Sequence, residues 1–215
     1  MGAENSEKSA GSSRMKQNYL VQAWLVLLLA VCFGSALAAV QMTLGPTIEA
    51  NKLNETLEKV PELVLGEEKA AQLQDKQKLT VLPSQVEVKT PAKTTYYSVF
   101  EAQMDGKRTG WVIKAKGQGY ADKIELLVGL DAGVEKITGL FILDQKETPG
   151  LGNKIIEAKW RGQFLGKNAG QPLRVTKTGA KAPEEIDSVS GATISSNTVC
   201  GILNTTLGDL KDKLK

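Results

Sequence analysis

The sequence of 215 residues contains no histidine and only two cysteines, Cys32 and Cys200. Without histidine, the chain cannot build a Ser-His-Asp or Cys-His nucleophile, a histidine-ligated haem or a histidine-containing zinc site. Two cysteines are too few for a disulfide framework or for a four-cysteine metal or iron–sulfur site within one chain. We therefore expect no metal ligands, and we expect a bound cofactor to supply any chemistry.

The chain also lacks a strong charge of either sign. Its 27 Lys and Arg residues against 24 Asp and Glu residues leave a formal net charge of +3. Because nucleic-acid-binding proteins usually present a strongly basic face, we expect no nucleic-acid partner. With 41% apolar and 24% charged residues, the composition is that of a globular protein of one or two domains.

One long stretch lacks charge altogether. No charged residue occurs between Lys16 and Glu49, and residues 23–40 are apolar with a single exception. Those 18 residues would span about 27 Å as a helix, close to the thickness of a bilayer's hydrocarbon core. Arg14 and Lys16 precede the stretch and the next basic residue is Lys52. The positive-inside rule then predicts a cytoplasmic N-terminus and an exported remainder.

The same stretch also fits a cleaved export signal. Ala36-Leu37-Ala38 has the small-x-small pattern of a cleavage site, and the basic flank suits a signal peptide. A lipoprotein signal ending at Cys32 fits less well, because Val31 stands where a small residue is wanted. All three interpretations export the rest of the chain.

These signals, together with changes in residue composition along the chain, divide it into four parts. Residues 1–19 are the expected cytoplasmic tail, 20–40 the transmembrane anchor, 41–93 a membrane-proximal part and 94–215 a folded domain. Hydrophobic patterns and turn residues predict the elements of the exported part. They are helices over 49–60, 155–164 and from Val199 to Leu214, and strands over 79–82, 86–88, 96–100, 111–116, 124–130, 137–143 and 172–176, with Pro83 and Pro91 interrupting the early strands and Asp105-Gly106 forming a turn.

Successive hairpins followed by a terminal helix predict an α+β fold. We expect an antiparallel sheet with flanking helices, preceded by one N-terminal transmembrane helix. Two glycine-rich segments interrupt this pattern. Gly117-x-Gly119 is typical of a hairpin turn, whereas Thr148-Pro149-Gly150-Leu151-Gly152 is either a strand-to-helix turn or a loop that brings its backbone close to a ligand.

The most informative segment runs from Asp187 to Asn197 and leads into the C-terminal helix. Its hydroxyl residues could cap that helix, and Ser195 or Ser196 would serve. A helix N-terminus is also an anion site, because its free N–H groups and its dipole favour phosphate. A hydroxyl there could bind a phosphate or be esterified to one.

Two short motifs resemble those of proteins that carry FMN covalently. Asp187-x-x-Ser190-Gly191-Ala192-Thr193 resembles the flavinylation motif, and Glu147-Thr148-Pro149-Gly150-Leu151-Gly152 resembles the second signature of the same family. The resemblance covers roughly residues 45–210. It is strongest to the G subunit of Rnf electron-transport complexes, and the C subunit of the sodium-pumping NADH:quinone oxidoreductase is a sibling.

The resemblance implies a role for each motif residue. In that family a flavin transferase uses FAD as donor and joins the FMN phosphate to the last threonine of the motif, which is Thr193 here. Ser190, Gly191 and Ala192 would give steric access, and Asp187 would belong to the sequence that the transferase recognises. The remaining expected cofactor-binding residues are those of the second signature, namely Glu147, Thr148, Gly150, Leu151 and Gly152.

The resemblance also implies a biological role. We expect an electron-carrying subunit of an ion-translocating ferredoxin:NAD oxidoreductase complex, rather than an enzyme acting alone. It would lie in the inner membrane beside other membrane subunits, with its N-terminus in the cytoplasm and the FMN domain outside. The alternatives are a C-type subunit of the quinone reductase, a stand-alone flavinylated carrier, and an exported binding domain without redox function.

Two further sets of residues have an open role. Trp111, Tyr120 and Trp160 either pack near the flavin ring or belong to the core. Cys200 lies beside apolar positions of the last helix, and we interpret it as a small buried hydrophobe rather than a redox thiol.

Overall fold

The computed structural model describes residues 4–72, 79–91 and 94–214, with side chains from residue 19 onward. The chain forms two compact units, residues 1–52 and residues 53–215. Helix α1 (Glu4–Leu65) contributes to both and runs unbroken through the expected tail, the expected anchor and the predicted helix 49–60. Between Tyr19 and Leu65 it is long and apolar enough to cross a membrane. Residues 1–3 of the expected tail lie outside the described residues.

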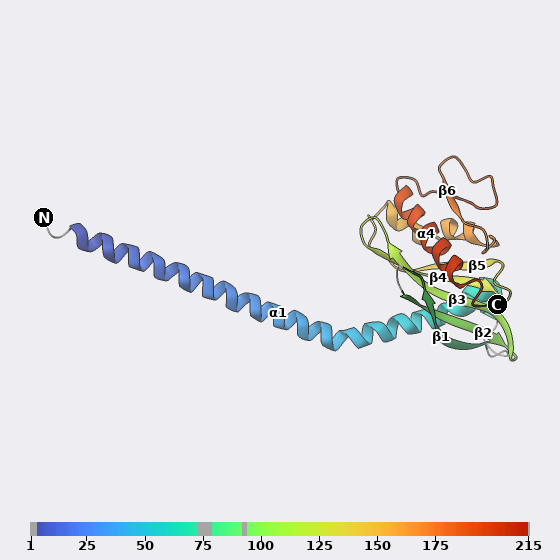
Figure 1. The fold of residues 1–215 in the computed structure, drawn as a ribbon, viewed down its shortest axis with the longest axis horizontal. Coiled ribbons are helices and arrows are strands. Elements are labelled where there is room, and N and C mark those ends of the chain that lie inside the picture. The colour runs from blue at the N-terminus through green and yellow to red at the C-terminus, as the bar shows by residue number, and fades with distance from the viewer. Residues whose placement is uncertain (1–3, 73–78, 92–93, 215) are drawn as a thin grey trace. The chain divides into compact units, whose positions relative to one another are not determined.

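The second unit is built on an antiparallel meander, as predicted (Figure 1). Its five strands follow one another in space in chain order, because each short turn returns the chain to the neighbouring position. The turn at Asp105 (φ 51°) and Gly106 (φ 73°) has the positive backbone angles of a tight hairpin. The strands are β1 (Leu79–Lys89), β2 (Thr94–Met104), β3 (Lys107–Gln118), β4 (Lys123–Asp131) and β5 (Ile137–Asp144), with the short helix α2 (Glu67–Gln72) before them.

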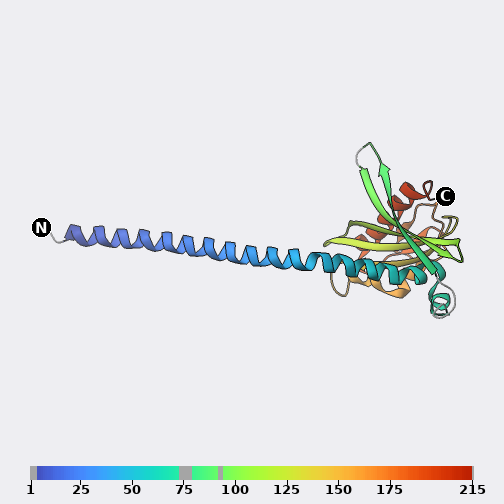
Figure 2. The same ribbon diagram turned by 90° about the horizontal axis from the view of Figure 1, so that it is seen from below.

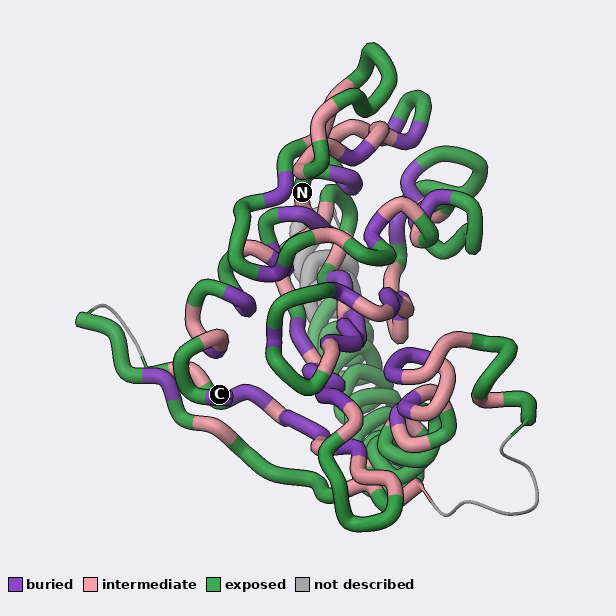
Figure 3. The backbone as a smooth tube through the Cα atoms, turned by 90° about the vertical axis from the view of Figure 1, so that its right-hand side faces the viewer, coloured by how far each residue is buried: buried purple, intermediate pink, exposed green. Residues whose placement is uncertain are grey.

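Each face of the sheet has its own hydrophobic core. Helix α4 (Thr193–Leu210) packs with Val99, Ile113 and Leu126 on one face. The last turns of α1, residues 53–65, pack with Phe100, Val112 and Leu127 on the other, and Figure 2 shows them beneath the strands. Both faces are covered, which explains why β4 reads as a nearly continuous apolar run. Many of the buried residues accordingly belong to the strands and to α4, and Figure 3 shows buried and exposed residues alternating along the backbone.

Two predicted boundaries were wrong. The strands over 79–82 and 86–88 are one strand, β1, in which Pro83 pairs with Phe100. β1 is an edge strand, and an edge tolerates proline because one side of its backbone needs no partner in the sheet.

The predicted helix 155–164 is three short pieces. They are η1 (Gly152–Ile156), α3 (Ala158–Arg161) and η2 (Gly162–Phe164). The first break occurs at Glu157, whose extended backbone (φ −64°, ψ 131°) ends the first turn. Beyond them, β6 (Arg174–Thr176) pairs in parallel with β7 (Glu185–Asp187) and leads the chain to α4.

Candidate functional site

Three segments far apart in sequence meet at the N-terminal end of α4. They are the β3–β4 connection around Tyr120, the loop that follows β5, and the first turn of α4 itself. They enclose a cavity of about 490 Å³. Its lining residues are Tyr120, Glu147, Thr148, Leu151, Gly152, Gly191, Ala192, Thr193, Ile194 and Ser195.

The carboxylate of Glu147 joins these three segments. Its Oε1 accepts hydrogen bonds from the backbone N–H groups of Tyr120 (2.9 Å) and Ala121 (3.2 Å). Its Oε2 accepts one from the hydroxyl of Ser195 at 2.6 Å. Glu147 is only 4% exposed, and a buried carboxylate is stable only when such bonds replace its water.

Glycine is required on both sides of that carboxylate. A Cβ atom at Gly119 would overlap Glu147 Oε1, and one at Gly152 would lie 2.8 Å from both Glu147 Oε2 and Ser195 Oγ. The two turns therefore contain glycine because a larger residue would collide with the Glu147 side chain that they enclose. Gly119, which the sequence predicted only as part of a turn, belongs to the site.

The loop between Thr148 and Gly152 folds back on itself. The N–H of Leu151 donates to the carbonyl of Thr148 at 3.1 Å, and Gly150 between them has a φ of 76°. Gly191 also has a φ of 76°, and a Cβ there would lie 2.8 Å from the Leu151 side chain. The loop thus lies directly over the motif that precedes α4.

The start of α4 differs from the predicted cap. The helix begins at Thr193 after Ala192, and no side chain caps it. Ser196 instead donates to the carbonyl of Ala192 (3.0 Å) and accepts from the N–H of Val189 (3.0 Å). The expectation that Ser195 or Ser196 caps the helix was wrong, because both hydroxyls are buried within its first turn.

The first turn of α4 is suited to an anion. It contains no acidic residue, so the positive end of the helix dipole is not compensated by its own side chains. Within the described residues 4–72, 79–91 and 94–214, the hydroxyl of the half-buried Thr193 forms no hydrogen bond. That hydroxyl therefore remains available at the cavity.

Seven of the ten residues singled out by sequence line the cavity. Gly150 lies at the turn of the loop, and Asp187 and Ser190 line a neighbouring pocket of about 370 Å³. There the backbone carbonyl of Asp187 accepts from Trp160 Nε1 at 2.8 Å, and its N–H donates to Gln163 Oε1 at 2.7 Å. The flavinylation-like motif therefore divides between two adjoining pockets.

Sequence reasoning left two features of the site unresolved. Of the three aromatic candidates, Trp111 and Trp160 are buried in the core, whereas Tyr120 is 65% exposed and lines the cavity. Exposed Leu151 and Ile194 line it as well. Ser195, interpreted only as a cap, is the partner of Glu147. Its signal in the sequence is a hydroxyl residue inside the first turn of an apolar helix, where a polar group must find a partner.

The thiol of Cys200 is buried and unreactive. Cys200 is 3% exposed, as predicted for a small hydrophobe, and burial raises the pKa of its thiol to about 12. A neutral buried thiol is a poor nucleophile and redox group. Among the residues that the structure describes, no cluster of three or more His, Cys, Asp or Glu side chains could hold a metal ion.

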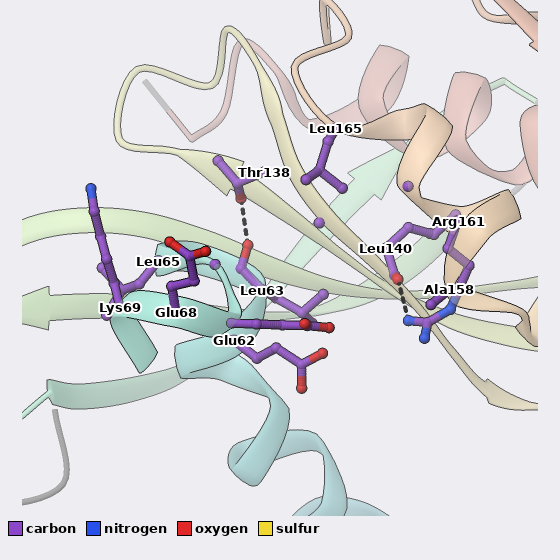
Figure 4. Close-up of a pocket in the computed structure, with 14 residues that line it drawn as sticks. Glu62, Leu63, Leu65, Glu68, Lys69, Thr138, Leu140, Ala158, Arg161 and Leu165 are labelled. Atoms are coloured by element: carbon purple, nitrogen blue, oxygen red, sulfur yellow. Dashed lines mark hydrogen bonds between the residues drawn. The ribbon is translucent and has the colours of Figure 1, made fainter. Parts of the chain in front are cut away.

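A second cavity lies on the α1 side of the sheet. It measures about 510 Å³ and is lined by the end of α1, the start of α2, β5, α3 and η2. Figure 4 shows Thr138 donating to the carbonyl of Leu63 (2.6 Å) and Arg161 donating to that of Leu140 (2.8 Å) beside it. It contains none of the residues singled out by sequence.

Comparison with known proteins finds a family that resembles this part of the chain. Residues 119–208 match the family described as the FMN-binding domain. The matched range includes every segment that lines the cavity at α4.

Several curated relatives of this chain are named as subunits of ion-translocating complexes. The G subunit of the Na(+)-translocating ferredoxin:NAD(+) oxidoreductase complex of Acetobacterium woodii is 38% identical over 109 residues, which cover 49% of this chain and 51% of that protein. The G subunit of the ion-translocating oxidoreductase complex of Methanosarcina acetivorans is 34% identical over 99 residues, covering 46% and 50%. The C subunit of the Na(+)-translocating NADH-quinone reductase of Vibrio anguillarum is 33% identical over 106 residues, covering 46% and 42%. The matches therefore span about half the length of these relatives or less.

Solved structures show the same fold. Shewanella oneidensis NqrC superposes with a TM-score of 0.60 at 21% identity, over 77% of this chain and 98% of that one. The C subunit of the Na(+)-translocating NADH-quinone reductase from Parabacteroides distasonis gives 0.57 at 21% identity, over 79% and 96%. At this identity the likeness shows the fold alone.

The residues present fit FMN. The cavity of about 490 Å³ has the size of pockets that hold small cofactors. The hydroxyl of Thr193 and the first N–H groups of α4 suit the phosphate. The exposed apolar parts of Tyr120, Leu151 and Ile194 suit the flat face of a flavin ring.

Proposed function

We propose that this protein is a membrane-anchored electron carrier with FMN joined covalently to Thr193. One observation carries the proposal. Within the range that matches the FMN-binding family, the free hydroxyl of Thr193 stands at the N-terminus of α4 and lines a cavity of flavin size. When bound, FMN supplies one- and two-electron transfer, and the chain supplies position and electrostatics.

The attachment is an esterification at Thr193. The hydroxyl oxygen forms a bond to the FMN phosphorus of FAD, the bond between the two phosphates breaks, and AMP leaves with the electron pair. The hydroxyl proton is lost, so the product is a phosphodiester with one negative charge. The N–H groups and dipole of α4 stabilise that charge. Asp187 and the exposed Ser190 remain accessible to a flavin transferase.

The biological setting follows from the relatives. Their names describe subunits of ion-translocating ferredoxin:NAD and NADH-quinone oxidoreductase complexes. We propose that this chain serves as the corresponding FMN-carrying subunit of the ferredoxin-linked type, beside other membrane subunits. Residues 20–40 would be the membrane anchor, and the basic residues that precede the apolar span would keep the tail 1–19 in the cytoplasm. The FMN-binding domain would face the outside.

The first experiment is to purify the full chain from its native host and view a denaturing gel under ultraviolet light. We expect fluorescence that survives denaturation and, on the peptide containing Thr193, a mass gain of one FMN less one water. Thr193→Ala should abolish both signals in a folded protein. Thr205→Ala, at an exposed position of the same helix, is the matched control and should retain them. Covalent FMN on another residue of the Thr193→Ala variant would refute the assignment.

A second candidate has support of its own. The 33% identity to the C subunit of the quinone reductase favours the C-type complex as an alternative setting for the same carrier. Membranes containing the complex distinguish the two by their reaction, since one couples ferredoxin to NAD and the other couples NADH to quinone. A colourless protein from a host that flavinylates other proteins would instead favour an exported binding domain without redox function.

A further inference from the structure

The role of Glu147 is open in the function proposed so far. Its carboxylate lies between two glycines and takes hydrogen bonds from two backbone N–H groups of the β3–β4 connection and from the hydroxyl of Ser195. Glu147 and Ser195 are 4% and 2% exposed. A buried charged group with this many partners fixes the segments that it joins.

The bond to Ser195 determines how the first turn of α4 is presented. Successive residues of a helix project about 100° apart, so Thr193 and Ser195 project about 200° apart. Because Ser195 is held on the buried side by Glu147, Thr193 projects away from that contact and is half-buried at another part of the cavity wall.

The way in which Glu147 binds also leaves the helix N-terminus free. The first turn has no acidic residue and no side-chain cap, and Glu147 contacts the hydroxyl of Ser195 at 2.6 Å rather than a backbone N–H of α4. A carboxylate in this position favours the positive end of the helix dipole. The N–H groups of the first turn meanwhile stay open to a phosphate.

We propose that Glu147 is a positioning residue for flavin attachment. It holds the first turn of α4, through Ser195, in the orientation that presents the Thr193 hydroxyl before any flavin is bound. This inference rests on the proposed attachment at Thr193. It assigns to Glu147 a contact with the protein, in place of the direct contact with FMN that the sequence predicted.

The test measures flavin transfer onto the full chain in detergent. Folded, flavin-free wild type, Ser195→Ala, Glu147→Ala and Glu147→Gln are each incubated with purified flavin transferase and FAD, and in-gel fluorescence is followed with time. Tyr97→Phe is the matched control, because it removes the bond from Tyr97 to Asp209 (2.7 Å) toward the other end of α4.

Loss of the contact should raise the apparent KM for the protein acceptor more than it lowers kcat, since fewer molecules present Thr193 at any moment. We expect a roughly tenfold rise for Ser195→Ala and at least as much for Glu147→Ala, the effect of one lost charged hydrogen bond. Glu147→Gln retains an oxygen for Tyr120 and Ala121 and can donate to Ser195 Oγ, so it should stay within about threefold of wild type. Tyr97→Phe should be unchanged.

Amide hydrogen exchange on the same flavin-free proteins gives a readout that needs no flavin. Exchange at residues 196–198, where the backbone N–H groups begin to bond within the helix, should accelerate in Ser195→Ala, while exchange in the middle of α4 stays at the wild-type rate. Transfer to Ser195→Ala at the wild-type KM, with unchanged exchange at residues 196–198, would overturn the role of Glu147. Should Glu147→Ala not fold, Ser195→Ala and Glu147→Gln decide the question. Failure of wild type itself to accept FMN would instead refute attachment at Thr193.

Discussion

The two faces of the sheet are covered in opposite ways. On one face, the end of α1 lies so close to the strands that a Cβ at Gly129 would overlap the carbonyl oxygen of Leu63. A Cβ at Gly139, the residue paired with Gly129 in β5, would lie 2.8 Å from the Leu63 side chain. On the other face, the first turn of α4 borders a cavity of about 490 Å³.

This difference suggests a separate task for each face of the sheet: one face anchors the end of α1, and the other provides the candidate binding site. Backbone packed directly on glycines, with Thr138 donating to Leu63, fixes the last turns of α1 on the sheet, and the cavity beside this contact contains none of the motif residues. At the start of α4 the contact is made instead by polar groups, Glu147 and Ser195. Such an arrangement leaves a cavity with Thr193 at its wall. We therefore expect substitutions on the α1 face to change stability, and those at the start of α4 to change flavin loading.

The largest effect on stability is expected from Gly129→Ala. The new methyl group would overlap backbone of α1 and lie 2.8 Å from Thr138 Oγ1, so the helix must move away from the sheet. We expect the free energy of unfolding to fall by about 3 kcal/mol, with flavin loading per folded molecule unchanged. Denaturant unfolding of the full chain in detergent, followed by tryptophan fluorescence, measures the loss.

The matched control for this change is Gly201→Ala in α4. A Cβ there meets nothing within 4 Å, and alanine in a helix is favoured over glycine by roughly 0.5–1 kcal/mol. The two variants should therefore shift stability in opposite directions. Equal stabilities would show that the close packing of α1 on the sheet is not what holds it.

A smaller loss of stability but a clear loss of loading is expected from Gly152→Ala. Its Cβ would lie 2.8 Å from Glu147 Oε2 and from Ser195 Oγ, so the hydrogen bond between those groups must lengthen or break. We expect about 2 kcal/mol less stability and slower transfer of FMN to folded protein. Normal loading of a destabilised Gly152→Ala would contradict the division between the two faces.

Much of the fold could be predicted because its signals are local. Alternating apolar residues and the Asp105-Gly106 turn predict consecutive hairpins, and the apolar stripe of α4 repeats over several turns. The prediction of one helix over 155–164 was wrong because its apolar residues lie on three short helical turns, which are separated at Glu157 and Gly162. Spacing alone does not distinguish that from one helix.

The contacts that build the site could not be predicted, because their partners are distant in sequence. Ser195 lies 48 residues from Glu147, and nothing near either residue identifies the other. The motifs supplied ten candidate site residues, and seven of these ten line one cavity. Gly129 carried a signal that the sequence analysis did not use, since a glycine inside an apolar strand often marks a close approach of backbone.

The smallest expected effect concerns the middle of α4. It tests whether the space open to solvent is confined to the cavity at the N-terminal end of that helix. Burial raises the pKa of the Cys200 thiol from an ordinary 9.0 to about 12. The unfolded chain therefore ionises first, and the stability that comes from the neutral thiol is present below pH 9 and lost as the pH rises toward 12. Between pH 8 and pH 10 we expect a loss of about 1.4 kcal/mol.

Cys200→Ala should remove most of that alkaline loss, and denaturant unfolding at the two pH values measures it. The variant itself should be less stable by about 1 kcal/mol at pH 8, since the smaller side chain leaves space in the core. Tyr97→Phe provides a second comparison, because burial and Asp209 also raise the pKa of Tyr97, so its removal should lessen the alkaline loss further. If wild type and Cys200→Ala lose stability equally between pH 8 and 10, water reaches the middle of α4. The space open to solvent would then extend past the contact between Glu147 and Ser195.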